Sequence, residues 1–509
     1  MHRGTRVARG ATAGLGAIAL LLAIPAAASA DTLKAFQNGV LPQTVAINSL
    51  WVIVAGVLVM FMQAGFAFLE IGFSRGKNAG TVIAKILVNF SIAAICFWAV
   101  GFAFAFGNGN ELIGTSGFFL AGADASSNFA LVNVAEGTIT LETLWFFQFV
   151  FCAVSLAIVW GTTLERIKFS AYVIYAVVFG AVIYPIVAHS VWGGGFLSDV
   201  GGKPVMDFAG SSVVHLTGAV GGLAALLLLG ARRGKYTADG SPRAIPGHSM
   251  PFVGLAVMIL WIGWFGFNGG STFGTADSFF GEVMLNTQLA AAAGVIGAVL
   301  VCYLKTKSLD VGMAGNGAIA GLVGITAPSG FVEFWAAPII GFIAGVFVVY
   351  SVIAIERRLD DPVGALSAHG MAGIWGTIAV GIFASPRLVS DGAAPGIFYG
   401  IKDGGFADSL GQLGVQALAV VATFTFVFVV SYAVFAALKA TIGLRVSEEE
   451  ELAGLDISTH GMYGYPESFI PREEYPGSST YEPSVAGTPI AKPTRVASPP
   501  SGPAATPSA

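Results

Sequence analysis

Two histidines stand out because each lies inside a strongly apolar stretch of the chain. His215 ends the segment Asp207-Phe-Ala-Gly-Ser-Ser-Val-Val-His, and His369 ends the segment Asp361-Pro-Val-Gly-Ala-Leu-Ser-Ala-His, so each follows an aspartate by eight residues. An ionisable side chain at membrane depth is costly and marks a functional site by default. A neutral imidazole can accept and donate hydrogen bonds, and a pair of imidazoles can also ligate haem iron. The matched spacing indicates two copies of one structural unit.

The composition places this chemistry in a membrane. Of the 509 residues, 55% are hydrophobic and only 11% are charged, and the mean hydropathy is +0.77. Values so far from those of soluble proteins predict an all-α polytopic membrane protein. We expect neither enzymatic activity nor nucleic-acid binding.

Eleven apolar runs are candidates to cross a bilayer, which takes roughly 17 to 25 helical residues. They span residues 47–72, 81–107, 142–162, 169–189, 211–231, 250–269, 286–305, 312–327, 332–355, 367–384 and 410–438. Lysine and arginine concentrate in alternate loops, which the positive-inside rule assigns to the cytoplasm. We therefore expect a multi-pass protein of the plasma membrane, with its mature N-terminus outside and its C-terminus in the cytoplasm.

The ends of the chain differ from this apolar body. Residues 1–30 carry arginines, then an apolar run, then Ala28-Ser-Ala30, which is typical of a secretory signal peptide. An uncleaved extra helix is the alternative. We expect the transmembrane domain at 31–440, a cytoplasmic regulatory tail at 441–465, and a disordered Pro/Ser-rich extension at 466–509.

The eleven spans divide into two five-helix units and a final helix. Because five is odd, the second unit is inserted upside down relative to the first, an arrangement common in transporters. The runs 211–231 and 367–384 are then equivalent, and they carry His215 and His369. At about 1.5 Å per residue, each histidine lies roughly 12 Å along the helix from its aspartate. One enters from outside and the other from inside, so both approach the midplane and can meet there.

Aromatic side chains gather at the outer ends of three predicted spans. Phe147 and Phe151 open one span, Trp192 precedes three glycines, and Phe267 lies shortly before Ser271. Aromatic faces attract cations, and a serine hydroxyl offers a compact acceptor. The clusters could form one cation-binding vestibule. The alternative is an aromatic belt at the membrane interface.

From about residue 45 to 465 the chain resembles the ammonium transporter (Amt/MEP/Rh) family. The motifs that carry the resemblance are Arg75-Gly-Lys-Asn78, Leu164-Glu-Arg-Ile-Lys-Phe-Ser170, His189-Ser-Val-Trp-Gly-Gly-Gly195, the two aspartate–histidine segments, Trp264-Phe-Gly-Phe-Asn268 and Gly317-Ala-Ile-Ala-Gly-Leu-Val323. The presence of Trp192 and Ser271 favours the bacterial ammonium transporter branch over the Rhesus branch.

The resemblance implies a homotrimer in which each subunit has its own pore between the inverted repeats. By position, Phe151, Trp192 and Ser271 match the family's external recruitment site for the ammonium ion. Phe151 and Phe267 match its stacked aromatic gate, and Phe147 lies one turn further out as a structural neighbour.

The same resemblance identifies His215 and His369 as the twin histidines of the pore. Asp207 matches a structural acidic residue, expected to order loops and cap its helix. We expect Asp361 to act as a cap on the cytoplasmic side. No metal or cofactor is expected, and Cys96, Cys152 and Cys302 are treated as packing residues.

These residues predict transport of ammonium, or of methylammonium as an analogue. The ion is recruited outside, loses its proton near the gate, and crosses as ammonia. One alternative is an ammonium sensor that signals through its cytoplasmic tail. A haem-binding redox protein fits less well, since there is only one such histidine pair and each histidine lies in a small-residue packing motif. A general water or solute channel fits the fold but not the arrangement of tryptophan, serine and phenylalanine.

Two acidic features are left over. Glu70 lies near the inner boundary of the first span, where a surface pair with Arg75 is the simplest interpretation and a pore-exit or trimer role is the alternative. The acidic run 448–451 falls where relatives receive a PII-type signalling protein. A solvated charge run is the alternative there.

Overall fold

The computed structural model describes residues 43–121, 129, 138–275 and 277–469. The expected signal peptide at 1–30 and residues 470–509 of the expected extension lie outside the described residues. The first residues of that extension do have structure, because Pro466–Phe469 forms a short helix, α20.

The described part of the chain is all-helical, and its few β-bridges are isolated. Within residues 43–469, apart from the undescribed gaps, ten helical segments are long and apolar enough to cross a membrane. They are α3 (Gln43–Phe73), η1 to α5 (Gly76–Phe106), α8 (Leu141–Thr162), α9 to α10 (Phe169–Trp192), η5 to α11 (Ser211–Leu229), α12 (Met250–Gly270), α13 (Phe279–Thr306), α15 (Ala336–Glu356), η6 to α16 (Leu366–Phe383) and α18 (Phe406–Thr441). The all-α multi-pass class predicted from composition is confirmed.

The predicted span at 312–327 is a shorter helix, α14 (Val311–Thr326), of 16 residues. At 1.5 Å per residue it covers about 24 Å, less than a hydrocarbon core of about 30 Å. The chain continues through buried turns at residues 327–332. Irregular backbone is tolerated at membrane depth where protein surrounds it, so this segment needs no full-length helix.

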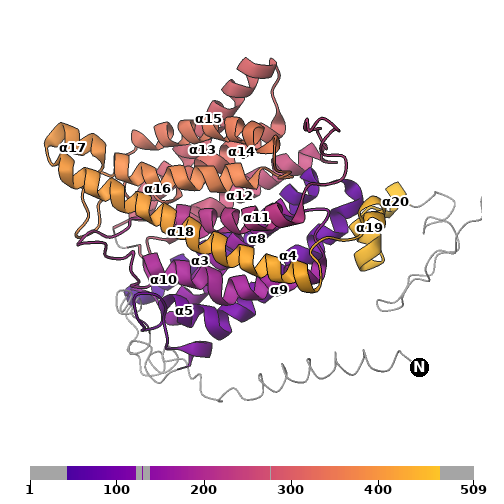
Figure 1. Ribbon diagram of the computed structural model, residues 1–509. Coiled ribbons are helices and arrows are strands. Elements are labelled where there is room, and N and C mark those ends of the chain that lie inside the picture. The colour runs from indigo at the N-terminus through magenta and orange to yellow at the C-terminus, as the bar shows by residue number, and fades with distance from the viewer. Residues whose placement is uncertain (1–42, 122–128, 130–137, 276, 470–509) are drawn as a thin grey trace, which may run out of the picture.

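The helices pack side by side in one bundle (Figure 1). The long helices α3 and α12 run against each other, α13 packs on α14 and α15, and α11 packs on α8 and α18. Helix α18 crosses the bundle obliquely and also contacts α16. It therefore ties together the two helices that follow the histidines.

Glycines allow the closest of these approaches. At Gly345 of α15, an added Cβ would overlap the carbonyl oxygen of Gly294 on α13. Lipid provides little hydrophobic drive between helices, so small residues that bring backbones together stabilise such bundles.

Candidate functional site

The two histidines lie in matching turns at the starts of two helices. His215 belongs to the π-helical turn η5 (Ser211–Leu216), and His369 belongs to the π-helical turn η6 (Leu366–Met371). Their Nδ1 atoms are 3.2 Å apart, and the rings stack with centroids 5.2 Å apart. Both side chains are buried. The structure thus brings the pair into direct contact through a widened helical geometry that is often found at functional sites.

The two aspartates hold the turns that carry the histidines. Asp207 accepts hydrogen bonds from the backbone N–H groups of Gly210, Ser211, Ser212 and Val213, at 2.8 to 3.1 Å. Burial raises the pKa of Asp207, and these four donors oppose that rise by stabilising the carboxylate. This is the hydrogen-bond pattern of a helix cap and leaves the carboxylate little capacity for a ligand.

Asp361 is the counterpart on the opposite side of the bundle. Its carboxylate accepts hydrogen bonds from the backbone N–H groups of Gly364 at 3.2 Å and Leu366 at 2.7 Å. Burial raises the pKa of Asp361 as well. Each aspartate therefore caps the helical turn that carries the histidine eight residues after it.

A column of rings leads from the outer aromatic cluster to the histidines. Phe151 stacks on Phe267 with centroids 3.9 Å apart, Phe267 stacks on His215 at 5.4 Å, and His369 lies 6.2 Å from Phe66 on the far side. Phe151 and Phe267 are buried, so the two rings close the column above the histidines. Nothing in the sequence singles out Phe66, which lies in a short apolar stretch between Gln63 and Glu70.

Trp264 forms one wall of this column. Its indole stacks on His215 at 5.2 Å, and its Nε1 donates a hydrogen bond to Thr326 Oγ1 at 2.9 Å. With its polar atom satisfied, the ring presents only apolar surface to the imidazole. In the sequence Trp264 appeared only as part of an outer aromatic motif, because its depth depends on which face of α12 points inward.

The outer cluster is only partly assembled in the described contacts. Trp192 lies edge-on to Phe151 at 6.3 Å, and its Nε1 donates to the backbone oxygen of Asp207 at 2.8 Å. Ser271 follows the end of α12 one turn beyond Phe267, to whose carbonyl its hydroxyl donates at 2.9 Å. That bond uses the hydroxyl proton and leaves the oxygen lone pairs able to accept.

Phe147 lies one turn outward from Phe151, as the spacing predicts. The two rings have centroids 4.7 Å apart, and Phe147 also meets Phe273 edge-on at 5.6 Å. Phe147 is fully buried and packs against Phe151 from the side.

The predicted surface pair between Glu70 and Arg75 is wrong. Glu70 is only 1% exposed, and Arg75 binds Glu165 instead, with Nη2 and Oε2 2.5 Å apart. Helix α3 ends at Phe73, so Arg75 lies beyond the helix and is free to turn away. Glu165, in a turn with positive φ, was not singled out although it lies in a quoted motif.

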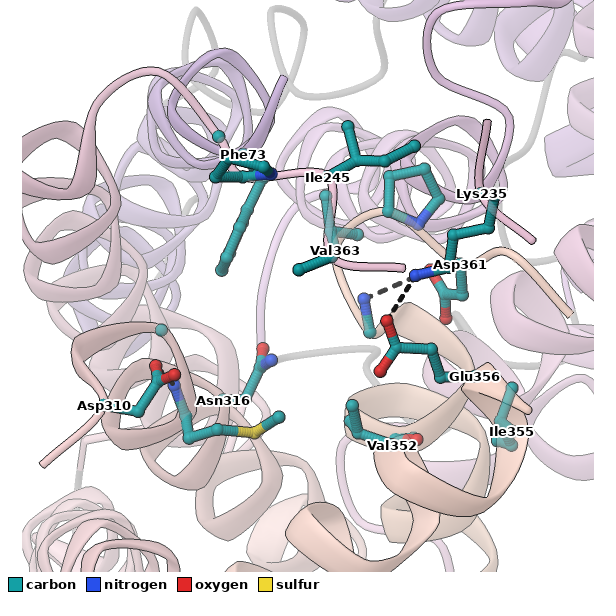
Figure 2. Close-up of a pocket in the computed structure, with 18 of the residues that line it drawn as sticks. Phe73, Lys235, Ile245, Asp310, Asn316, Val352, Ile355, Glu356, Asp361 and Val363 are labelled. Atoms are coloured by element: carbon teal, nitrogen blue, oxygen red, sulfur yellow. Dashed lines mark hydrogen bonds and ion pairs between the residues drawn. The ribbon is translucent and has the colours of Figure 1, made fainter. Parts of the chain in front are cut away.

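Two cavities follow on the far side of His369. The first is lined by His369, Phe66, Glu70, Asn316 and Val363 among others. The second, of about 380 Å³, opens among loops and helix ends and is shown in Figure 2. Asn316 and Val363 line both, so the cavities adjoin there.

The wider cavity has a polar rim. Lys235 forms an ion pair with Glu356, and Asp310 and Asp361 stand at other points of its wall (Figure 2). A space lined by charged groups suits a hydrated ion, unlike the aromatic column above it. The surroundings thus change from apolar at the rings to polar at the wider cavity beyond His369.

Comparison of the chain with known proteins identifies its family. The model of the Ammonium Transporter Family matches residues 50–465. "Ammonium transporter Amt2" of Archaeoglobus fulgidus is 44% identical over 90% of this chain and 96% of its own length. "Ammonium transporter" of Bacillus subtilis is 34% identical over 83% of this chain and 99% of its own.

Solved structures agree with these relatives. A structure titled "Sensor Amt Protein" matches with a TM-score of 0.73 at 35% identity, covering 82% of this chain and 98% of that one. Mep2 from Candida albicans matches with a TM-score of 0.72 at 28% identity, covering 85% and 93%. The family resemblance inferred from the motifs is confirmed, and the chain belongs to the Ammonium Transporter Family.

Proposed function

We propose that this ammonium transporter recruits the ion at Phe151, Trp192 and Ser271, deprotonates it near the Phe151–Phe267 gate, and conducts ammonia along the histidine pair. The observation that carries this proposal is the continuous column of buried rings that ends at the 3.2 Å contact between imidazoles. A column without charged side chains is suited to a neutral molecule.

The physical reason is the cost of desolvation. Moving an intact ion into apolar surroundings is far more costly than moving a neutral molecule that can hydrogen-bond to imidazole nitrogen. Potassium resembles ammonium in charge and size but has no proton to release. The column therefore selects by acidity, after the outer aromatic site has selected by charge.

Uptake by purified protein in liposomes tests the proposal. We expect saturable uptake of ammonium and methylammonium, and no protein-dependent flux of potassium itself. Protein-free liposomes provide the baseline. Uptake no faster than that baseline, or potassium flux equal to ammonium flux, would contradict the proposal.

Substitution of Trp192 by leucine is expected to weaken recruitment more than conduction. Removing the cation–π contact loses about 0.5 to 2 kcal/mol, which corresponds to a half-saturating ammonium concentration roughly 2- to 30-fold higher. The maximal uptake rate should change less than the half-saturating concentration. Concentration series of uptake in liposomes measure both.

Trp335→Leu provides the matched control. Trp335 is 40% exposed and packs on Phe383 and Phe398, away from the ring column. Its half-saturating concentration should equal that of the native protein. Equal values for the two variants would remove Trp192 from the recruitment site.

We propose the membrane arrangement that the sequence indicated. Helix α14 and its buried extension serve as the eighth of eleven segments, in two inverted five-helix repeats with α18 added, and three copies form a homotrimer. The mature N-terminus lies outside the plasma membrane and the C-terminus inside. Cross-linking and mass measurement of detergent-purified protein test the trimer, and a monomer throughout would overturn it.

The segment 441–465 docks on the inner helix ends, which supports a regulatory role. Glu451 is buried, where it binds Arg445 at 2.6 Å and accepts a hydrogen bond from the backbone of Arg233 at 2.8 Å. Asp456 accepts hydrogen bonds from the backbone of Gly80 and Thr81 at 2.9 and 2.7 Å. Part of the acidic run is therefore structural rather than solvated.

Asp456→Asn is expected to release this tail. The carboxylate accepts charge-assisted bonds from three backbone donors, including Gly464, each worth about 1.5 to 3 kcal/mol. Limited proteolysis should cut residues 441–465 at least about tenfold faster than in the native protein. Glu449→Gln, an exposed change in the same segment, is the control. Identical cleavage of all three proteins would contradict this docking.

A PII-type regulatory protein is the partner we propose for the exposed part of the tail. A pull-down with the full-length transporter tests it under nitrogen-replete conditions. Recovery of a PII-type protein that is lost after tail release would support the proposal, and failure to recover one would contradict it.

The second candidate function is an ammonium sensor acting through the tail. The observation that favours it is the likeness to a structure titled "Sensor Amt Protein", together with the docked tail. A sensor would change tail protection on addition of ammonium in liposomes while showing no protein-dependent flux. Measured flux favours the transporter.

A further inference from the structure

Glu70 and Asn316 present unsatisfied oxygen atoms to the small cavity below His369. Glu70 is 1% exposed and Asn316 is 5% exposed. In the described part of the chain, neither carboxylate oxygen of Glu70 nor Oδ1 of Asn316 has a hydrogen-bond partner. Buried polar groups normally have a hydrogen-bond partner, so these unpaired acceptors indicate that the cavity binds a molecule with hydrogen-bond donors.

The cavity has the size for a single small donor. About 10 Å³ is open to the centre of a water-sized molecule, which is close to the minimum for one such molecule. Glu70, Asn316 and His369 all line it, and most of its other walls are aliphatic. A guest here meets acceptors on two helices and the imidazole of the pore.

The charged surroundings of Glu70 come from one neighbouring helix. Lys85 of α4 (Ala79–Cys96) is buried beside it, and the Lys85 ammonium lies 3.6 Å from the centroid of the Trp160 ring on α8. No ion pair within 4.0 Å joins Lys85 to Glu70 in the described residues. The adjacent helix α12 contributes no titratable side chain, and Tyr172 on α9 is hydrogen-bonded to Asn89.

A structural counter-ion for Lys85 would be expected to bond it directly. A buried ion pair is stable only where geometry is good and the remaining lone pairs are satisfied. Here the lysine rests on an aromatic face and the carboxylate points into a cavity. The arrangement leaves the carboxylate free for a ligand that carries several N–H donors.

We propose that Glu70 and Asn316 form an inner ammonium site, where ammonia that has passed the histidines takes up a proton before release. The inference rests on the function proposed above. The proton removed from the ion outside passes through His215 and His369 to the Glu70 carboxylate. Ammonia then accepts it, so that Glu-COOH and NH₃ become Glu-COO⁻ and NH₄⁺.

This step returns every group to its starting state. The N–H bond broken at the outer gate is formed again at Glu70, the two imidazoles end neutral, and one positive charge has crossed with each ammonia. The re-formed ion gives N–H bonds to Glu70 and Asn316, then leaves through the polar cavity that Asn316 also lines. Transport is therefore electrogenic.

The test separates charge movement from ammonia movement. Ammonium-evoked current on supported membranes measures the first, and uptake of isotopically labelled methylammonium into liposomes, corrected for protein-free liposomes, measures the second. Glu70→Gln should lower the current at least about tenfold, as loss of a proton acceptor does, and should leave protein-dependent ammonia entry within about twofold. Glu70→Asp should retain current with a displaced pH profile.

Two further variants keep the result decisive. Glu70→Gln combined with Lys85→Met removes both buried charges, so it carries the test if the single variant does not fold. Glu333→Gln, which removes a partly exposed carboxylate bound to Arg387, should keep full current. Native current in either Glu70→Gln protein would overturn the inner site.

Failure of the underlying function has a different signature. His369→Ala should lower both current and protein-dependent ammonia entry, whereas the Glu70 variants affect only current. A native protein without either signal would overturn the transport function and the inner site together. Loss of both signals in Glu70→Gln, with normal yield and folding, would make Glu70 a structural residue and overturn the proposal.

Discussion

Replacement of His369 by alanine is expected to lower ammonium current by about 100-fold or more, the range found when a positioned proton-transfer group is removed. The change removes one side of the 3.2 Å contact between Nδ1 atoms and leaves His215 facing a void. Currents evoked by ammonium jumps on reconstituted protein measure the loss. His215→Ala should have a similar effect.

The two histidines should behave as a unit. Groups that act together show effects far from additive, so the double variant should be about as inactive as either single variant. His248→Ala is the control, because His248 is exposed and lies outside the ring column. Native current in both single pore variants would dismiss the histidine pathway.

The position of the histidine pair could be predicted from sequence because it depends on regular geometry. A helix has a fixed rise, so the matched spacing from aspartate to histidine predicts that His215 and His369 lie close together, and their Nδ1 atoms are 3.2 Å apart. The caps at Asp207 and Asp361 could be predicted for a similar reason, since a cap depends on residues a few positions away. Both features need only local structure and a count of spans.

The features that escaped prediction depend on packing between distant segments. The π-helical turns around His215 and His369 contain no residue that signals a departure from a regular α-helix. The sequence places Glu70 near the inner boundary of the first predicted span, 47–72, where an exposed side chain is expected. In the structure Arg75 turns to Glu165, 90 positions away, and Glu70 is left inside.

The same limit applies to the predicted span at 312–327. Apolar composition shows that a segment is shielded from water. It does not distinguish a helix that faces lipid from a turn that is buried inside the protein. The chain after Thr326 is held by Ser211, whose hydroxyl receives a hydrogen bond from the backbone of Ala327 at 2.8 Å. Only the fold reveals such a partner.

A buried ion network joins the inner ends of several helices and should be essential for stability. Asp360 accepts bonds from the backbone nitrogen, Nε and Nη2 of Arg232 at 2.7, 2.9 and 2.9 Å. The Nη2 atom of Arg166 lies 3.9 Å from its carboxylate, and all three side chains are buried. The network links the loops after α8, α11 and α15.

Burial alone would raise the pKa of Asp360, but hydrogen bonds and charge from Arg232, together with Arg166, lower it to about 2. A carboxyl group whose pKa is lower in the folded than in the unfolded protein stabilises the folded state at pH values above its ordinary pKa. That contribution is therefore complete at neutral pH and is lost only as the pH falls toward 2. Within the physiological pH range a change of pH does not alter this contribution to stability. A substitution that removes the Asp360 charge is therefore needed to measure it.

Asp360→Asn is therefore expected to destabilise the protein by about 3 to 5 kcal/mol, because it removes the carboxylate that directly bonds Arg232 and lies nearest Arg166, and leaves Glu165, 3.7 Å from Arg232, to balance two buried guanidinium groups. The unfolding temperature in detergent, followed by intrinsic fluorescence, should fall by roughly 5 °C or more. Asp408→Asn is the matched control, since Asp408 is exposed and lies 3.6 Å from Lys203, a pairing worth about 0 to 1 kcal/mol. Equal unfolding temperatures for the two variants would show that the network only positions the loops and does not stabilise the bundle.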